Sequence, residues 1–281
     1  METSSRRKST IVDQPIINSP FEYPKGHWVF EEGLPRREQG RRKAGYYSRT
    51  RNEKSHKTVV AAQEFIELPE VNKIRDRLAN WRKNGYPGVS RISLDLLRHW
   101  TSADRTHRLF FCQLEAVETI IWLVEGMPSE KHGINLPTDL ATDPTSREKG
   151  YSSFQRYCCK MATGSGKTVV MAMVVAWSVL NKLYNRQDKR FSDAILIICP
   201  NLTIKERLSV LKPSNYNNYY EKFDLVPREL LPELSKARII VTNWHLFLPI
   251  NDESIRSVIR RGIESNRSFI QRWPPKRKLL L

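Results

Sequence analysis

Long apolar runs are missing from this sequence. The longest, Val169 to Leu180, contains Trp177 and Ser178 and falls short of the ~18 residues that a membrane-spanning helix needs. No apolar segment follows the basic residues near the N-terminus, so the sequence gives no sign of a secretory signal. We therefore expect a cytoplasmic protein without a membrane partner.

Cysteine is scarce, and its spacing excludes the usual cysteine-based sites. The chain has four cysteines, and none of them forms a C-x-x-C pair. A disulfide framework or a zinc site is disfavoured by this pattern. The apolar surroundings predict buried free thiols at Cys112, Cys158, Cys159 and Cys199.

Acidic residues are outnumbered, with 30 Asp and Glu against 47 Lys and Arg, which leaves a formal net charge of +17. Such an excess suggests a polyanionic partner, although solvated basic surfaces are also common. A hydrophobic fraction of 40% in 281 residues is enough for one large or two small globular domains.

The residues before position 106 fall into two segments that differ in composition and hydrophobic pattern. Residues 1–57 form a basic arm punctuated by proline, in which cations and aromatics such as Tyr46 and Tyr47 alternate. This arm could bind a single nucleic-acid strand by stacking and phosphate contacts, or it could pack loosely on the core. Residues 58–105 predict a helical region, because apolar residues recur on one helical face from Val71 to Trp81 and a second short helix is expected from Ser93 to Trp100.

The most specific motif lies in the middle of the chain. An apolar run from Tyr157 to Met161 precedes Ala162-Thr163-Gly164-Ser165-Gly166-Lys167-Thr168, and a long apolar segment follows. Strand, glycine-rich turn and helix in this order predict a phosphate-binding loop rather than an ordinary turn. Backbone N–H groups of Thr163 to Gly166 would surround the phosphates, Lys167 would reach the β- and γ-phosphates, and the Thr168 hydroxyl would bind Mg²⁺.

A glutamine upstream of this loop is a candidate for reading the base. Gln113 lies at the start of an amphipathic helix, and Phe111 directly precedes it in an aromatic pair. A side-chain amide can bond the N6/N7 edge of adenine, and the aromatic ring can stack on the base, although glutamines at helix starts are ordinary.

Two later apolar runs predict strands of a parallel sheet. Residues 194–199 and 237–241 are nearly continuous in apolar side chains, which is typical of strands covered on both faces. Polar residues follow each strand at the edge where open parallel sheets bind ligands, or they are simply turn formers. We expect backbone-phosphate contacts with DNA from Asn201, Thr203, Thr242 and Asn243.

Residues 106–248 resemble the ATPase subunit of type III restriction enzymes and its DEAD/DEAH-box relatives in helicase superfamily two. The resemblance is carried by Phe111 to Ala116, Lys160 to Thr168, Cys199 to Ile204 and Ile240 to His245. Met161 replaces the glycine that opens most phosphate loops, and a non-glycine residue commonly stands at this position in that superfamily. The resemblance implies a P-loop, RecA-like α/β first lobe that binds ATP and Mg²⁺, acts on DNA as a helicase or translocase, and could have a modification methyltransferase as partner.

One motif of that family is missing. A strand ending in Asp-Glu-x-His should supply the Mg²⁺ carboxylates, yet the only Asp-Glu pair is Asp252-Glu253, which follows the preceding strand too closely to end another central strand. Residues 249–281 form a basic tail without periodicity, which suggests a truncated or frame-shifted product.

We therefore expect an ATP-binding N-terminal part of a restriction-type DNA helicase whose hydrolysis is weak. The alternatives are a nucleotide- or DNA-binding remnant without turnover, and a P-loop enzyme of another class such as a transporter ATPase or small-molecule kinase.

Overall fold

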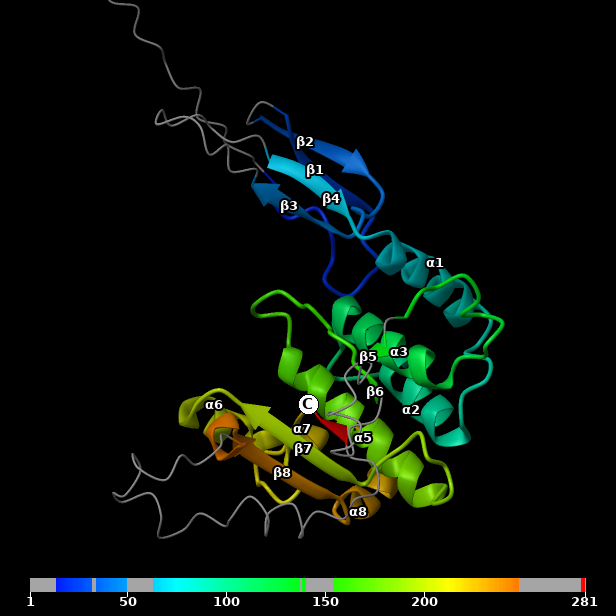
Figure 1. The fold of residues 1–281 in the computed structure, drawn as a ribbon, viewed down its shortest axis with the longest axis vertical. Helices are drawn as coiled ribbons and strands as arrows, with labels where there is room; N and C mark the ends of the chain where they lie inside the picture. Colours follow the sequence, from blue (N-terminus) through cyan, green and yellow to red (C-terminus); the bar gives the residue numbers. More distant parts are fainter. Residues whose placement is uncertain are drawn as a thin grey trace, which may run out of the picture. The chain divides into compact units, whose positions relative to one another are not determined.

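The computed structural model describes residues 14–31, 34–49, 63–136, 138–139, 154–247 and 279–280 (Figure 1). The chain divides into two compact units, each assembled from segments that are separated in sequence. The first unit comprises Met1–Pro87, Phe110–Cys112 and Met127–Cys158; the second comprises Gly88–Leu109, Gln113–Gly126 and Cys159–Leu281.

The first unit consists mainly of antiparallel ribbons. Strand β1 (Gly26–Glu31) pairs with β2 (Leu34–Gln39), and β3 (Gly45–Arg49) pairs with β4 (Gln63–Glu67). The short strands β5 (Thr138–Asp139) and β6 (Phe154–Gln155) also pair. Two expectations are corrected here: the predicted loose arm contains three strands, and the predicted helical region begins with β4.

Helix α1 (Pro69–Lys83) confirms the helical pattern that ends at Trp81. Proline in the first turn suits the helix start because its missing N–H would have no partner there. Trp81 is buried and donates from Nε1 to the Pro87 carbonyl at 2.9 Å, which fixes the chain after the helix.

The second unit contains a parallel sheet in the order β8-β7-β9. Strand β7 (Ala194–Cys199) matches the prediction, and β8 (Arg238–Asn243) runs two residues beyond it. The registers pair Ala194 with Arg238, and Ile195 with Leu279 of β9 (Leu279–Leu280). Aliphatic residues fill β7, as expected for a strand covered on both faces.

The helices of this unit are α2 (Arg91–Thr101), α3 (Phe111–Glu125, of which the residues from Gln113 onward belong to this unit), α5 (Lys167–Tyr184), α6 (Leu202–Arg207), α7 (Tyr219–Lys222) and α8 (Leu231–Leu234). Three short 3₁₀ turns also lie in the described part of this unit: η1 (Leu208–Leu211), which directly continues α6, η2 (Arg228–Leu230) and η3 (Trp244–Phe247). Residues 202–211 thus form a short α-helix followed by a 3₁₀ turn.

Helix α5 is the central element of the second unit, as Figure 1 shows. It is apolar around nearly its whole circumference and is packed by α2, α7 and α8. A helix that is apolar on all sides is stable only in such an interior position. In the described part of the chain, no helix combines the length and apolar character needed to cross a bilayer.

A buried polar network ties α2, α3 and α5 together. The Glu125 carboxylate, 4% exposed, accepts from the Ser90 backbone N–H and from Trp177 Nε1, both at 2.7 Å. Ser93 Oγ also donates to it, and Asn181 Nδ2 donates to Ser93 Oγ at 2.9 Å. The network therefore holds the helix that follows the phosphate loop in a fixed position within this unit.

Candidate nucleotide site and the adjoining sheet edge

The chain reaches the glycine-rich loop without forming the predicted strand. Residues 156–162 adopt no regular secondary structure. The prediction of a strand from Tyr157 to Met161 was therefore wrong. The apolar character of this segment is weak, since Tyr157, Cys158 and Cys159 are exposed together with Lys160. Without a burying partner, a short run of this kind gains too little to pair in a sheet.

The loop itself has the geometry of an anion site. Gly164 and Gly166 have φ angles of +81° and +82°, which place them in the left-handed region. Gly166 is the N-cap of α5, and its carbonyl accepts from Val169 and Val170 N–H at 2.9 and 3.2 Å. The first N–H groups of α5 have no partner within the helix and, with the helix dipole, favour an anion.

The Ala162 carbonyl accepts three hydrogen bonds from donors of the loop and the first residue of α5. It accepts from Ser165 Oγ at 2.6 Å, from Ser165 N–H at 3.3 Å and from Lys167 Nζ at 2.9 Å. The lysine is thereby folded back over the loop, where its ammonium group lies near the helix start. Sequence reasoning did not anticipate this carbonyl, because a backbone oxygen carries no residue-type signal.

Gln113 contacts the loop directly. Its side chain is 6% exposed, and Nε2 donates to the Ser165 carbonyl at 3.1 Å. A Cβ on Gly166 would overlap this amide group, so the glycine also provides room for Gln113. The structure therefore brings the glutamine and the phosphate loop together, and adenine reading by Gln113 stays a prediction.

Phe111 has its neighbours in the first unit. Its ring lies 5.5 Å from that of Tyr23, and the guanidinium carbons of Arg41 and Arg82 lie 5.7 and 5.6 Å from its centroid. Its backbone N–H donates to the Pro20 carbonyl at 2.8 Å. Stacking of Phe111 on adenine stays a prediction.

Lys167 and Thr168 are the first two residues of α5. At this position they could contact the phosphates of a nucleoside triphosphate and its Mg²⁺ ion. Lys167 is exposed and Thr168 is partly exposed, and Thr163, Gly164 and Ser165 form the adjoining open loop. A left-handed glycine pair, unpaired helix N–H groups and a lysine fit a Mg²⁺-nucleotide. Within the described residues, no cluster of three or more His, Cys, Asp or Glu side chains could hold a metal ion by itself, and Asp252-Glu253 lies outside those residues.

The four predicted DNA contacts lie at the carboxyl edge of the sheet, but they differ in accessibility. Asn201 caps α6 by accepting from Ile204 N–H at 2.9 Å, and Thr203 is exposed in the first turn of that helix. Asn243 is partly exposed and its Oδ1 lies 2.8 Å from His245 Nδ1. Thr242 is only 4% exposed, so of the four it is the least accessible to a phosphate.

The phosphate loop lies at this same edge. Ser178 Oγ near the end of α5 donates to the Ser192 carbonyl just before β7, at 3.0 Å. Helix α5 therefore runs antiparallel to β7, and its N-terminus lies toward the carboxyl end of the strand (Figure 1). In open parallel sheets this is the edge at which ligands bind.

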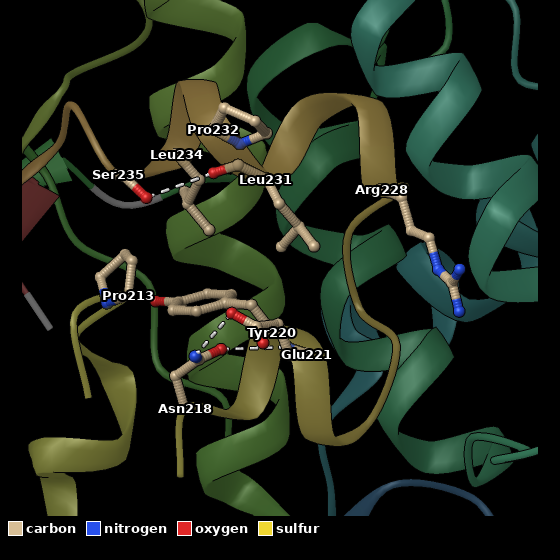
Figure 2. Close-up of a pocket in the computed structure, with 9 residues that line it drawn as sticks. All are labelled: Pro213, Asn218, Tyr220, Glu221, Arg228, Leu231, Pro232, Leu234 and Ser235. Atoms are coloured by element: carbon tan, nitrogen blue, oxygen red, sulfur yellow. Dashed lines mark hydrogen bonds between the residues drawn. The ribbon is translucent and has the colours of Figure 1, made fainter. Parts of the chain in front are cut away.

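A separate cavity of about 210 Å³ is lined by residues between Pro213 and Ser235, which precede β8 in the sequence (Figure 2). Its polar groups bond to the protein itself: Tyr220 Oη donates to Leu211 at 2.7 Å, and Asn218 Nδ2 donates to Glu221 at 3.0 Å. Figure 2 shows Arg228 extending away from the other lining residues. None of the predicted site residues lines this cavity, and we assign it no ligand.

The cysteines are the clearest failure of the sequence reasoning near the site. Cys199 is buried as predicted, whereas Cys112, Cys158 and Cys159 are exposed. Burial of Cys158 and Cys159 was predicted from the apolar run around them. That run forms no strand, and its residues from Tyr157 to Lys160 are exposed to solvent.

Comparison with known proteins gives one family. No curated protein and no solved structure matches the chain significantly. The family model described as "Type III restriction enzyme, res subunit" matches residues 106–257, which include Gln113, the phosphate loop, β7 and β8. The chain therefore belongs to the family of type III restriction enzyme res subunits.

Proposed function

We propose that this chain binds ATP and Mg²⁺ at the loop between Ala162 and Thr168 and serves an ATP-dependent DNA helicase or translocase of a restriction system. Membership of the res-subunit family suggests helicase ATPase activity in general. The observation that carries the proposal is the pair of left-handed glycines before α5, with Lys167 folded over them and Gln113 bound to the loop.

Each residue of the loop has a defined task in this proposal. The N–H groups around Gly164 and Gly166 would bind the phosphates. Lys167 would release the Ala162 carbonyl and donate instead to the β- and γ-phosphates. Thr168 provides a hydroxyl for Mg²⁺, which neutralises phosphate charge when bound. Gln113 holds the loop at Ser165 and reads adenine, since an amide has two donor hydrogens and a carbonyl acceptor.

DNA would bind along the same sheet edge through its phosphates. Thr203 and Asn243 are the accessible candidates, and Asn201 and Thr242 support them from the cap of α6 and the end of β8. Hydroxyl and amide groups at these positions bind a backbone without reading its sequence.

We further propose that this chain alone hydrolyses ATP slowly. The sequence contains no Asp-Glu-x-His segment that could place carboxylates on Mg²⁺ and the attacking water. Nucleotide binding, which depends mainly on the phosphate loop, is expected to persist.

The test compares wild type with Lys167→Ala by titration with a fluorescent ATP analogue in Mg²⁺ buffer, followed by ATPase assays with and without DNA. The matched control is Lys236→Ala, which removes an exposed lysine that pairs with Glu233 at 2.6 Å. We expect nucleotide affinity to fall at least tenfold in Lys167→Ala and to be unchanged in the control. Equal affinity in all three proteins would refute the nucleotide site.

The ATPase assay separates the helicase from a binding remnant. Slow turnover that DNA stimulates and Lys167→Ala abolishes supports the enzyme. Nucleotide binding without any turnover above the Lys167→Ala background supports the remnant.

A further inference from the structure

The first unit carries a dense band of positive charge that the nucleotide site does not use. Residues 34–48 contain five cationic side chains and one carboxylate, Glu38. Glu38 pairs with Arg36 at 2.7 Å, and Lys43 pairs with Glu67 of β4 at 3.1 Å. This charge balance suits a polyanion. The five cations are Arg36, Arg37, Arg41, Arg42 and Lys43.

Two aromatic rings lie on the β3–β4 ribbon beside this charge. Tyr47 is directly opposite Phe65 in the antiparallel register, and their centroids are 5.3 Å apart at an interplanar angle of 61°. Tyr47 is 54% exposed and Phe65 is 36% exposed. A cross-strand aromatic pair stabilises its ribbon by ring–ring contact, and the exposed parts of these two rings leave room for a nucleic-acid base to stack on them.

Gly45 makes room for this arrangement. A Cβ at Gly45 would overlap the Phe65 ring, so the ring lies over the backbone of β3 at this residue. Gly45 is not among the glycines with positive φ. The ring, rather than the backbone conformation, therefore explains the glycine.

Arg42 joins the charge to the rings. Its guanidinium carbon lies 5.2 Å from the centroid of Tyr47 and 5.5 Å from that of Phe65. The preceding residue, Arg41, lies 5.6 Å from the ring of Tyr23 in the same way. Because the guanidinium group of Arg42 lies over one face of Tyr47, a base would stack on the other face, and the adjoining phosphate would find a cation at the edge of the same ring.

We propose that Arg42, Tyr47 and Phe65 form a binding surface for a single nucleic-acid strand, with a base stacked on Tyr47 and the adjoining phosphate held by Arg42. An unpaired strand fits better than a duplex, because the bases of a duplex are stacked on one another and offer no free face. Stacking and phosphate contacts do not read base edges, so binding should be tolerant of sequence. This surface is additional to the sheet-edge residues of the second unit.

The experiment measures fluorescence anisotropy of a short labelled oligo(dT) and of a duplex of the same length, with the full chain and no nucleotide. Tyr47→Ala should bind the single strand about 5- to 100-fold more weakly than wild type, while duplex affinity changes less than about twofold. Arg42→Ala should weaken binding of both and lower the slope of log affinity against log salt for the single strand by about 0.7.

Two controls keep the result interpretable. Tyr216→Ala removes a tyrosine that is 93% exposed in the second unit, and Arg91→Ala removes an arginine whose side chain is 93% exposed. Both should bind the strand as wild type does. Tyr47→Ala should also retain wild-type affinity for the ATP analogue, which shows that the second unit is folded.

Photocrosslinking with an iodouracil oligonucleotide provides a second readout. A crosslink at Tyr47 or Phe65 supports the surface directly. Unchanged strand affinity in Tyr47→Ala, equal losses of strand and duplex affinity in Tyr47→Ala, or crosslinks confined to the second unit would each overturn the proposal.

Discussion

Gly164 and Gly166 share a backbone conformation but differ in what surrounds them. Both have φ near +80°, yet a Cβ at Gly164 would meet nothing within 4 Å, whereas one at Gly166 would overlap the Gln113 amide. Backbone strain acts at both positions, and steric conflict acts only at Gly166.

This difference predicts unequal effects of alanine. Gly164→Ala should cost about 1–2 kcal/mol from left-handed strain alone. Gly166→Ala should cost more and should lower affinity for ATP further, because Gln113 and the loop must move apart. Urea denaturation and analogue titration of the two variants provide the check, and equal losses would show that the Gln113 contact does not matter.

Gln113 predicts a second result at the residue scale. If the amide both supports the loop at Ser165 and reads the base, Gln113→Ala should lower the affinity for both nucleotides, and the affinity for ATP should fall more than the affinity for GTP. Competition titrations with the two nucleotides measure this. A parallel loss for ATP and GTP would leave the loop contact as the whole role of Gln113.

Helix α5 depends on the carboxylate at the end of α3. Glu125→Ala would remove the acceptor of the Ser90 N–H and one of the two acceptors of the buried Trp177 Nε1, which would keep only Ser93 Oγ at 2.9 Å. We expect a loss of about 3 kcal/mol in the free energy of unfolding. Glu229→Ala, at an exposed position in η2, is the matched control and should change stability by less than about 0.5 kcal/mol in urea denaturation.

The link between α5 and β7 contains an acid-sensitive pair. Arg190 donates to Asp188 from Nη2 at 2.7 Å and from Nε at 3.1 Å. These hydrogen bonds lower the pKa of Asp188 below its ordinary value of 3.8. A lowered folded-state pKa means that the pair stabilises the fold above pH ~4 and loses this effect as the pH falls through the folded-state pKa.

Asp188→Asn should therefore cost about 0.5–1 kcal/mol at neutral pH and progressively less below pH ~4. Unfolding free energies of both proteins between neutral and acidic pH test this. A difference that stays constant down to pH ~2 would show that the Asp188 charge is not responsible.

Comparison of the predicted and observed elements shows which signals in the sequence were sufficient. Strand β7 was predicted to the residue because its continuous aliphatic run is buried on both faces, and the glycine spacing of the phosphate loop predicted the start of α5. Strand β4 was missed because its partner, β3, is distant in sequence and the ribbon is exposed. A single sequence does not reveal such pairing, nor the contact of Gln113 with Ser165.

At the scale of the whole molecule, the charge of +17 predicts how binding should respond to salt. Each phosphate neutralised on a single strand contributes about −0.7 to the slope of log affinity against log salt. If the basic residues of the first unit act together on one strand, we expect a slope steeper than about −3 for oligo(dT), which corresponds to at least about four phosphates. Binding of the ATP analogue should depend on salt much more weakly, because one triphosphate held largely by backbone N–H groups releases few counterions. Anisotropy titrations over a series of salt concentrations give both slopes, and an oligo(dT) slope shallower than about −1 would mean that the basic residues do not act together on one strand.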